Sequence, residues 1–168
     1  MSFIQRWRAS AGLRGLALGG GVLVGVWLIA VAQAQDEQGD EVTWEERPYT
    51  VIDGKVDFGT YNGYRRYDNN CLRCHGPDGA GSSYAPSLVN SLKRLDYEQF
   101  IETVIYGREN LSGTQPSIMP PFGEVTDVVD NLDDIYSYLK ARADGEIGRG
   151  RPGRLAEEDD PVWQERRG

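Results

Sequence analysis

The chain has 168 residues, of which 39% are hydrophobic and 26% are charged, and its formal net charge is −8. This length and apolar content suit one domain with tails and exclude a wholly disordered chain. The acidic excess argues against a broad nucleic-acid surface, because phosphate binding needs clustered positive charge. Two cysteines and one histidine exclude a disulfide scaffold, a Cys/His zinc finger and a multi-histidine metal site.

Residues 1–34 have the parts of a secretory signal peptide. Three arginines and no acid precede residue 15, residues 15–32 carry no charge, and Ala32-Gln33-Ala34 is a small-x-small cleavage pattern. This combination directs export, so we expect cleavage after Ala34, a periplasmic protein and a net charge that falls from −8 to −11 as three arginines leave. The alternative is that residues 15–32 stay as a membrane anchor, although their glycines weaken a membrane-spanning helix.

The mature chain is expected to consist of an acidic N-terminal arm over 35–57, a compact domain over 58–145, and a flexible polar tail over 146–168. The tail combines Gly, Arg and Pro with a run of four acidic residues, a composition typical of unstructured segments. The arm offers four possible docking points for the domain, namely Trp44, Tyr49, Val51 and Ile52.

Helical periodicity predicts three helices in the domain. Apolar residues recur at helical spacing in the second and third, and Asp96 can form a capping box with Gln99 at the start of the second. No alternating strand pattern is present. Three short helices and long loops bury little apolar surface, so we expect an added group to fill the core. The predicted helices cover Thr60–Asn69, the stretch from Asp96 to Gly107, and Asn131–Ala143, with Gly-, Ser- and Pro-rich loops over 76–91 and 110–127.

Cys71-Leu72-Arg73-Cys74-His75 has the C-x-x-C-H spacing of covalent haem attachment. Two thiols at this separation can reach two vinyl groups on one porphyrin edge, and the adjacent histidine can ligate iron. A redox-active Cys71–Cys74 disulfide is the alternative, but it is expected in a βαβ setting, which this sequence lacks. We therefore expect one haem c, bound through Cys71 and Cys74, with His75 as an iron ligand.

Met119 is the candidate for the sixth iron ligand. Met1 would leave with the signal peptide, and no second histidine exists. Met119 lies in a Pro-rich loop instead of on a helical stripe, and a thioether favours ferrous iron and raises the redox potential. The alternative is a core-filling methionine, which would leave the iron open to small ligands.

These motifs resemble the class I cytochromes c over about residues 58–143. Gly63 and Tyr67 stand eight and four residues before Cys71, as in the first helix of that family. The resemblance implies that Gly63 packs closely on the C-terminal helix, at Ile135 or Tyr138. It also implies an all-α class I cytochrome c fold, with three to five short helices and long loops wrapped around one covalent haem.

The same resemblance assigns roles in the loop that follows the haem motif. It implies that the carbonyl of Pro86 accepts a hydrogen bond from the second ring nitrogen of His75, which orients the ligand. It further implies that Leu88 packs on the haem.

A narrower resemblance is to the methanol-metabolism-related c-type cytochromes, which are similar to cytochrome cL. Members of that group accept electrons in the periplasm from PQQ-dependent methanol or alcohol dehydrogenases, including lanthanide-dependent ones. The resemblance implies a monomeric electron carrier, not an enzyme, that passes electrons to a downstream cytochrome c or terminal oxidase. The similar stretches are 56–67, 81–88 and 133–145.

Two other functions stay open at this point. A haem peroxidase-like enzyme would need an open iron site and a distal acid–base group, and the lack of a second histidine counts against it. A subunit of an oxidase or dehydrogenase complex would be tethered by residues 15–32. The acidic net charge either steers a basic partner or forms a solvated surface.

Overall fold

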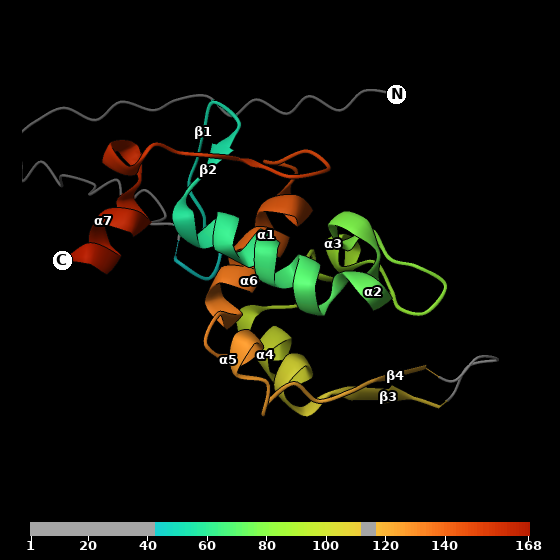
Figure 1. The fold of residues 1–168 in the computed structure, drawn as a ribbon. Helices are drawn as coiled ribbons and strands as arrows, with labels where there is room; N and C mark the ends of the chain where they lie inside the picture. Colours follow the sequence, from blue (N-terminus) through green and yellow to red (C-terminus); the bar gives the residue numbers. More distant parts are fainter. Residues whose placement is uncertain (1–42, 112–116) are drawn as a thin grey trace, which may run out of the picture. The chain divides into compact units, whose positions relative to one another are not determined.

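The computed structural model describes residues 43–111 and 117–168 (Figure 1). The predicted signal peptide and the start of the predicted arm lie outside the described residues. Among the described residues, no helix has the length and apolar content needed to cross a membrane. The helices are α1 (Phe58–Asn70), α2 (Leu72–His75), α3 (Leu88–Ser91), α4 (Tyr97–Tyr106), α5 (Thr126–Val129), α6 (Leu132–Asp144) and α7 (Pro161–Arg167), with 3-10 turns η1 (Pro77–Gly79) and η2 (Glu157–Asp159).

Helix α1 begins two residues before the predicted start because Asp57 caps it. The Asp57 carboxylate accepts hydrogen bonds from the backbone N–H and the hydroxyl of Thr60, at 2.8 and 2.9 Å, which satisfies a donor of the first turn. Helix α1 then packs on α6 at Gly63, where a Cβ atom would lie 1.7 Å from the carbonyl oxygen of Asp134 and 2.9 Å from the nitrogen of Ile135. The predicted close approach of these two helices is therefore present, at Asp134 and Ile135.

Helices α4 and α6 follow the sequence prediction closely. Asp96 and Gln99 form the predicted capping box at the start of α4, and α4 ends before Gly107, whose φ is +74°. Helix α6 ends at Gly145, also left-handed with φ +81°. The two helices present one apolar core whose buried members include Phe100, Val104, Leu132, Ile135, Tyr136 and Leu139.

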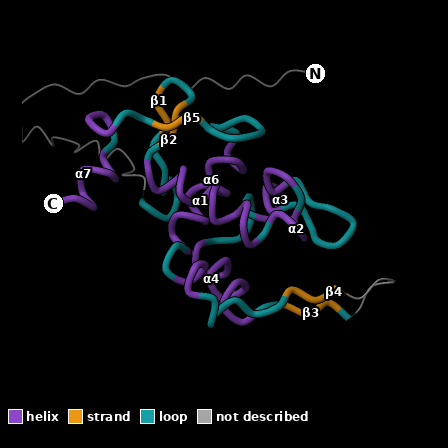
Figure 2. The backbone as a smooth tube through the Cα atoms, viewed as in Figure 1, coloured by secondary structure: helices purple, strands orange, loops and turns teal. Residues whose placement is uncertain are grey.

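The strands are short and were not predicted (Figure 2). Each spans two or three residues, too few for an alternating pattern to be recognised. Strands β1 (Val51–Ile52), β2 (Lys55–Val56) and β5 (Gly153–Arg154) form one sheet in the order β1-β2-β5, and β3 (Arg108–Asn110) pairs with β4 (Ser117–Met119) in an antiparallel hairpin.

The described part of the predicted arm is docked on the domain. The hydroxyl of Tyr49 donates a hydrogen bond of 2.8 Å to Asp144, and Tyr49 is buried. Trp44 packs edge-on against Tyr97, with ring centroids 5.1 Å apart. Of the four predicted docking points, Tyr49 and Val51 pack in or against the core, whereas Trp44 and Ile52 are 45% and 47% exposed.

The prediction of a flexible tail over 146–168 is wrong for this structure. Leu155 is buried, and its N–H donates to the carbonyl of Val56 beside the parallel β2–β5 pair. Helix α7 is capped by Asp160, and its Arg166 pairs with the buried carboxylate of Asp134 at 2.5 Å. The segment is polar on average, which is why it was predicted to be flexible. Leu155 and Arg166 nevertheless bind residues far away in the sequence, Val56 and Asp134.

Candidate haem site

An apolar cavity is lined by residues of α2, α3, α4, α5 and α6 and by Met119 at the end of β4. The space within it, including the solvent at its opening, is about 550 Å³, and its lining is almost wholly apolar. Ile135 and Leu139 on the α6 wall are almost fully buried, whereas Cys71 and Met119 are half-buried, so the cavity opens on their side. The lining residues are Cys71, His75, Leu88, Leu92, Leu95, Phe100, Thr103, Val104, Met119, Phe122, Val128, Ile135 and Leu139.

His75 is the last residue of α2 and is buried against the cavity. Its Nδ1 lies 3.0 Å from the carbonyl oxygen of Pro86, the contact that the resemblance implied. A carbonyl can only accept, so Nδ1 carries the proton and Nε2 keeps a free lone pair. The 76–86 loop returns to this point because Gly81 N–H donates to the His75 carbonyl at 2.7 Å. The histidine is therefore held in the tautomer that a metal ligand needs.

Both cysteines of the motif are free thiols, with Cys71 on the cavity wall and Cys74 exposed. Burial, and secondly the charge of Cys74, raises the pKa of the Cys71 thiol to about 12. The described residues include no group of three or more His, Cys, Asp or Glu side chains able to hold a metal ion. The pair thus presents one thiol to an apolar cavity and one at its rim, an arrangement suited to attaching a flat apolar group by its edge.

Met119 lies at the end of β4 and lines the same cavity as His75. Strand pairing places it across from Arg108, and the loop beyond it is tied to α4 by the bond from Phe122 N–H to the Val104 carbonyl at 2.9 Å. Gly107 is required here, because a Cβ at that residue would lie 2.5 Å from the Met119 carbonyl. Met119 is therefore held by the hairpin and by α4, as well as by its prolines.

Most of the predicted site residues share this cavity. Cys71, His75, Leu88 and Met119 line it, Pro86 reaches it through its carbonyl, and Cys74 lies beside it on the surface. The sequence analysis missed Leu92 and Leu95. Their spacing from Leu88, four and seven residues, is the helical pattern that could have identified them.

Cytochrome c-555 of Methylococcus capsulatus is 43% identical to this chain over 96 residues, which are 72% of that protein. The chain belongs to the c-type cytochromes. The solved structure of c-type cytochrome XoxG from Methylobacterium extorquens AM1 matches with a TM-score of 0.59 and 45% identity, over 70% of this chain and 74% of that one. Family membership and the predicted all-α class I fold are thereby confirmed.

Two further similarities cover a smaller share of the relative or of this chain. Cytochrome c-553I of Paracoccus denitrificans is 41% identical over 126 residues, which cover 74% of this cytochrome and 56% of that relative. The chain therefore matches little more than half the length of c-553I. The family model described as "Cytochrome C oxidase, cbb3-type, subunit III" matches residues 60–139.

Membership fixes the chemical class of this cytochrome. A c-type cytochrome holds haem c covalently and transfers electrons, so the chain is an electron-transfer protein and not an enzyme. The residues present fit that cofactor, because the cavity is apolar, the Cys71 thiol is on its wall with Cys74 exposed nearby in the chain, and an imidazole and a thioether both line it.

Asp78, a site residue that the sequence analysis did not identify, fixes the loop behind His75. It has a left-handed backbone with φ +60°, and its carboxylate accepts hydrogen bonds from Gly150 N–H at 2.8 Å and Arg149 Nε at 3.0 Å. From the other side, the Tyr67 hydroxyl accepts from Gly79 N–H at 3.0 Å and donates to the Gly76 carbonyl. The C-terminal segment and α1 thus hold the haem-attachment loop between them.

We expect Asp78→Asn to destabilise the cytochrome by about 1–2 kcal/mol at neutral pH, because Arg149 and Gly150 then face a neutral amide. Burial by itself would raise the pKa of Asp78, but the Gly150 and Arg149 hydrogen bonds and the Arg142 charge lower it below its usual range. A lowered carboxyl pKa contributes stability that is present at neutral pH and lost as the pH falls below about 4.

Denaturant unfolding of wild type and variant at pH 7, 5 and 3 measures this effect. The difference should be equal at pH 7 and 5 and shrink at pH 3. Asp130→Asn is the matched control, since Asp130 is exposed and its carboxylate should contribute little. A difference that persists unchanged at pH 3 would show that the charge of Asp78 is not its stabilising feature.

Proposed function

We propose that this cytochrome is an exported one-electron carrier with a single haem c, attached through Cys71 and Cys74 and ligated by His75 and Met119. The observation that supports this most strongly is that His75 and Met119 line one apolar cavity, with Cys71 on its wall. The only histidine and the only methionine of the mature chain are thus brought together by the fold.

The haem, when bound, supplies one-electron iron chemistry. The chain's own residues supply the rest. His75 Nε2 is aimed by the Pro86 carbonyl, and the Met119 thioether is fixed by the β3–β4 hairpin. Two protein ligands leave no iron position for a substrate, and the leucines and phenylalanines of the wall exclude water. A thioether ligand and an apolar site both favour the ferrous form, which raises the potential.

We assign a PQQ-dependent methanol or other alcohol dehydrogenase as the electron donor, and a downstream cytochrome c or terminal oxidase as the acceptor. Support comes from the resemblance of three stretches to the methanol-metabolism-related cytochromes and from the similarity to XoxG and cytochrome c-555. The basic, apolar and small-residue parts of residues 1–34 support export to the periplasm.

Rapid mixing tests the donor. Oxidised holo-cytochrome is mixed with a PQQ-dependent methanol dehydrogenase and methanol, and the ferrous haem absorbance is followed. We expect fast reduction that saturates with dehydrogenase concentration. A cytochrome with a normal haem spectrum that this enzyme and a PQQ-dependent ethanol dehydrogenase both fail to reduce would overturn the donor assignment and leave the electron carrier in place.

The description of the matching family model, a subunit of a cbb3-type oxidase, favours one second candidate, a membrane-tethered subunit held by residues 15–32. Sequencing the N-terminus of the protein isolated from cells distinguishes the two. An N-terminus at Gln35 excludes a covalent tether. Recovery of Phe3 from membranes would establish the tether and overturn the free carrier.

We expect Met119→Ala to keep the haem attached but to lower its midpoint potential by on the order of 0.1 V, because the thioether that favours ferrous iron is lost. The reduced variant should also bind carbon monoxide at neutral pH, whereas wild type should not. Redox titration and absorbance measure both effects. Ile118→Ala is the matched control on the same strand. A variant with unchanged spectrum and potential would exclude Met119 as a ligand, and carbon monoxide binding by wild type would show that the iron lacks a sixth protein ligand.

A further inference from the structure

The segments that frame the haem cavity differ in charge from the rest of the molecule. Residues 71–95, 107–111 and 117–123 contain most of the cavity wall outside α4 and α6. They hold four basic and two acidic residues, a formal charge of +2, in a chain whose net charge is −8. One of the two acids, Asp78, is buried and paired with Arg149. These segments therefore carry a net positive charge on an otherwise acidic protein.

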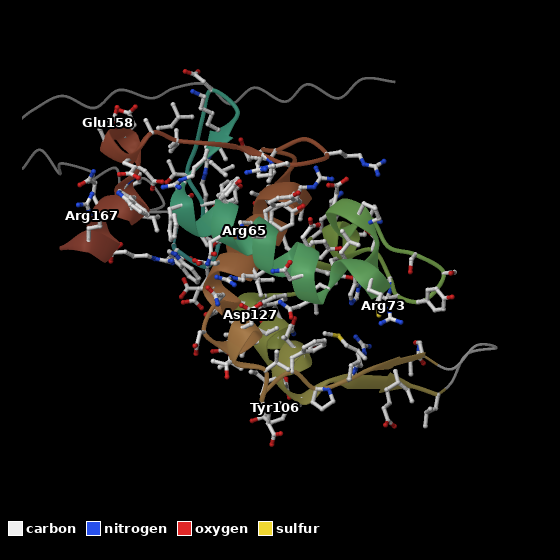
Figure 3. All side chains as sticks on the ribbon, in the orientation of Figure 1. Arg65, Arg73, Tyr106, Asp127, Glu158 and Arg167 are labelled. Atoms are coloured by element: carbon white, nitrogen blue, oxygen red, sulfur yellow. The ribbon has the colours of Figure 1, made fainter. Side chains whose placement is uncertain are left out.

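Two of the four basic residues flank the cavity opening. Arg73 is exposed and lies between Cys71 and Cys74, and in Figure 3 it projects from α2 on the side of the β3–β4 hairpin. Arg108 is exposed and pairs directly with Met119 across the hairpin. Neither arginine takes part in an ion pair with any carboxylate of the described residues.

Strand geometry decides which face of the hairpin carries the charge. Directly opposed residues in an antiparallel pair point to the same face, and successive residues alternate. Arg108 therefore shares the cavity face with Met119, while Glu109, opposite Ile118, lies on the outer face. The one exposed acid of the framing segments is thus turned away from the opening.

An exposed aromatic residue completes this surface. Tyr84 is 78% exposed. Its loop is held beside Cys74, because the hydroxyl of Ser82 donates to the Cys74 carbonyl at 2.5 Å and accepts from the Tyr84 N–H at 3.0 Å. Aromatic residues and arginines are the side chains enriched at protein interfaces.

We propose that Arg73, Tyr84 and Arg108, here called the mouth patch, are the docking surface for the electron donor, and that the donor presents clustered carboxylates to it. This inference rests on the proposed function and specifies the partner. The net charge of −8 alone would favour a basic donor, whereas the mouth patch favours an acidic one. An acidic donor is attracted at the mouth patch and repelled elsewhere, so that the haem side is selected as the contact face.

A charge-reversal pair tests the proposal in the holo-cytochrome. Arg73→Glu with Arg108→Glu changes the mouth patch. Lys55→Glu with Arg65→Glu gives the same net charge at exposed positions elsewhere, on β2 and along α1 (Figures 1 and 3). Reduction by a PQQ-dependent methanol dehydrogenase with methanol, at an ionic strength of about 0.1 M where distant charges are screened, should slow at least about tenfold in the first variant and less than about twofold in the second.

Inorganic oxidants provide a readout that needs no protein partner. Oxidation of the ferrous cytochrome by anionic hexacyanoferrate(III) should slow several-fold in the mouth-patch variant relative to the control variant, and oxidation by cationic tris(phenanthroline)cobalt(III) should not slow. Haem carboxylates contribute equally to both variants, so the comparison reports the arginines. Tyr84→Ser should slow the dehydrogenase reaction alone.

The outcomes separate the two proposals. If the dehydrogenase reduces wild type and both charge variants at equal rates, the mouth patch is not the docking surface, while the proposed function stands. If the two variants react equally with hexacyanoferrate(III), the arginines do not border the haem, and the docking proposal is overturned on that ground alone. Failure of both the methanol and the ethanol dehydrogenase to reduce wild type overturns the proposed donor and the docking proposal together.

Discussion

Cys71→Ala is expected to reduce the yield of chains carrying covalent haem at least about tenfold, and to leave the remaining chains largely unfolded. Cys71 is the thiol on the cavity wall, and all but a few of the thirteen wall residues are apolar. Without a bound group those apolar side chains lose the contacts that hold them, because an empty cavity destabilises in proportion to its volume. The cofactor's binding energy is then folding energy, as in small metal-dependent domains.

Haem staining of a denaturing gel, with far-ultraviolet circular dichroism of the same samples, measures both effects. The few chains that hold haem through Cys74 should show a haemochrome band shifted to longer wavelength, since one vinyl group stays unreacted. Ser82→Ala is the matched control, because it removes the hydrogen bond to the Cys74 carbonyl but keeps both thiols. A wild-type haemochrome spectrum and full yield in Cys71→Ala would contradict attachment at that residue.

The helices that sequence reasoning predicted correctly are those set by local interactions. The capping box of Asp96 with Gln99 and the period of α6 depend on residues within one or two turns, and both are present. The tail was mispredicted because its order depends on distant partners. Leu155 bonds to Val56, and Arg166 pairs with Asp134, residues that no local pattern connects.

The same division applies to the site. The C-x-x-C-H spacing is local because the chemistry of attachment is local, and Met119 followed from counting the possible ligands. The contacts that hold the loop behind His75 are not local. Asp78 lies 71 residues before Arg149, and no sequence pattern predicts that these two residues form a pair. The loop that orients the haem ligand is thus held by a C-terminal segment whose composition resembles disorder.

Gly63→Ala is expected to destabilise the holo-cytochrome by on the order of 4 kcal/mol, a large part of the stability of a small domain. The added Cβ would lie 1.7 Å from the Asp134 carbonyl oxygen and 2.3 Å from its carbon, so backbone must move and no side-chain rotation relieves the clash. Separating α1 from α6 also disturbs the buried Asp134 carboxylate, which accepts from Asn62 at 2.7 Å and from Arg166 at 2.5 Å.

Thermal unfolding followed by circular dichroism should show a Tm at least about 10 °C lower for Gly63→Ala. Gly148→Ala is the matched control, because a Cβ there meets nothing within 4 Å, and its Tm should stay within about 2 °C of wild type. A Gly63→Ala protein as stable as that control would mean that α1 and α6 cross at a greater separation. Helix α1 leads into Cys71, and α6 contributes Ile135 and Leu139 to the cavity wall. The attachment motif and the haem pocket would then be positioned by the covalent haem and not by the close contact of these two helices.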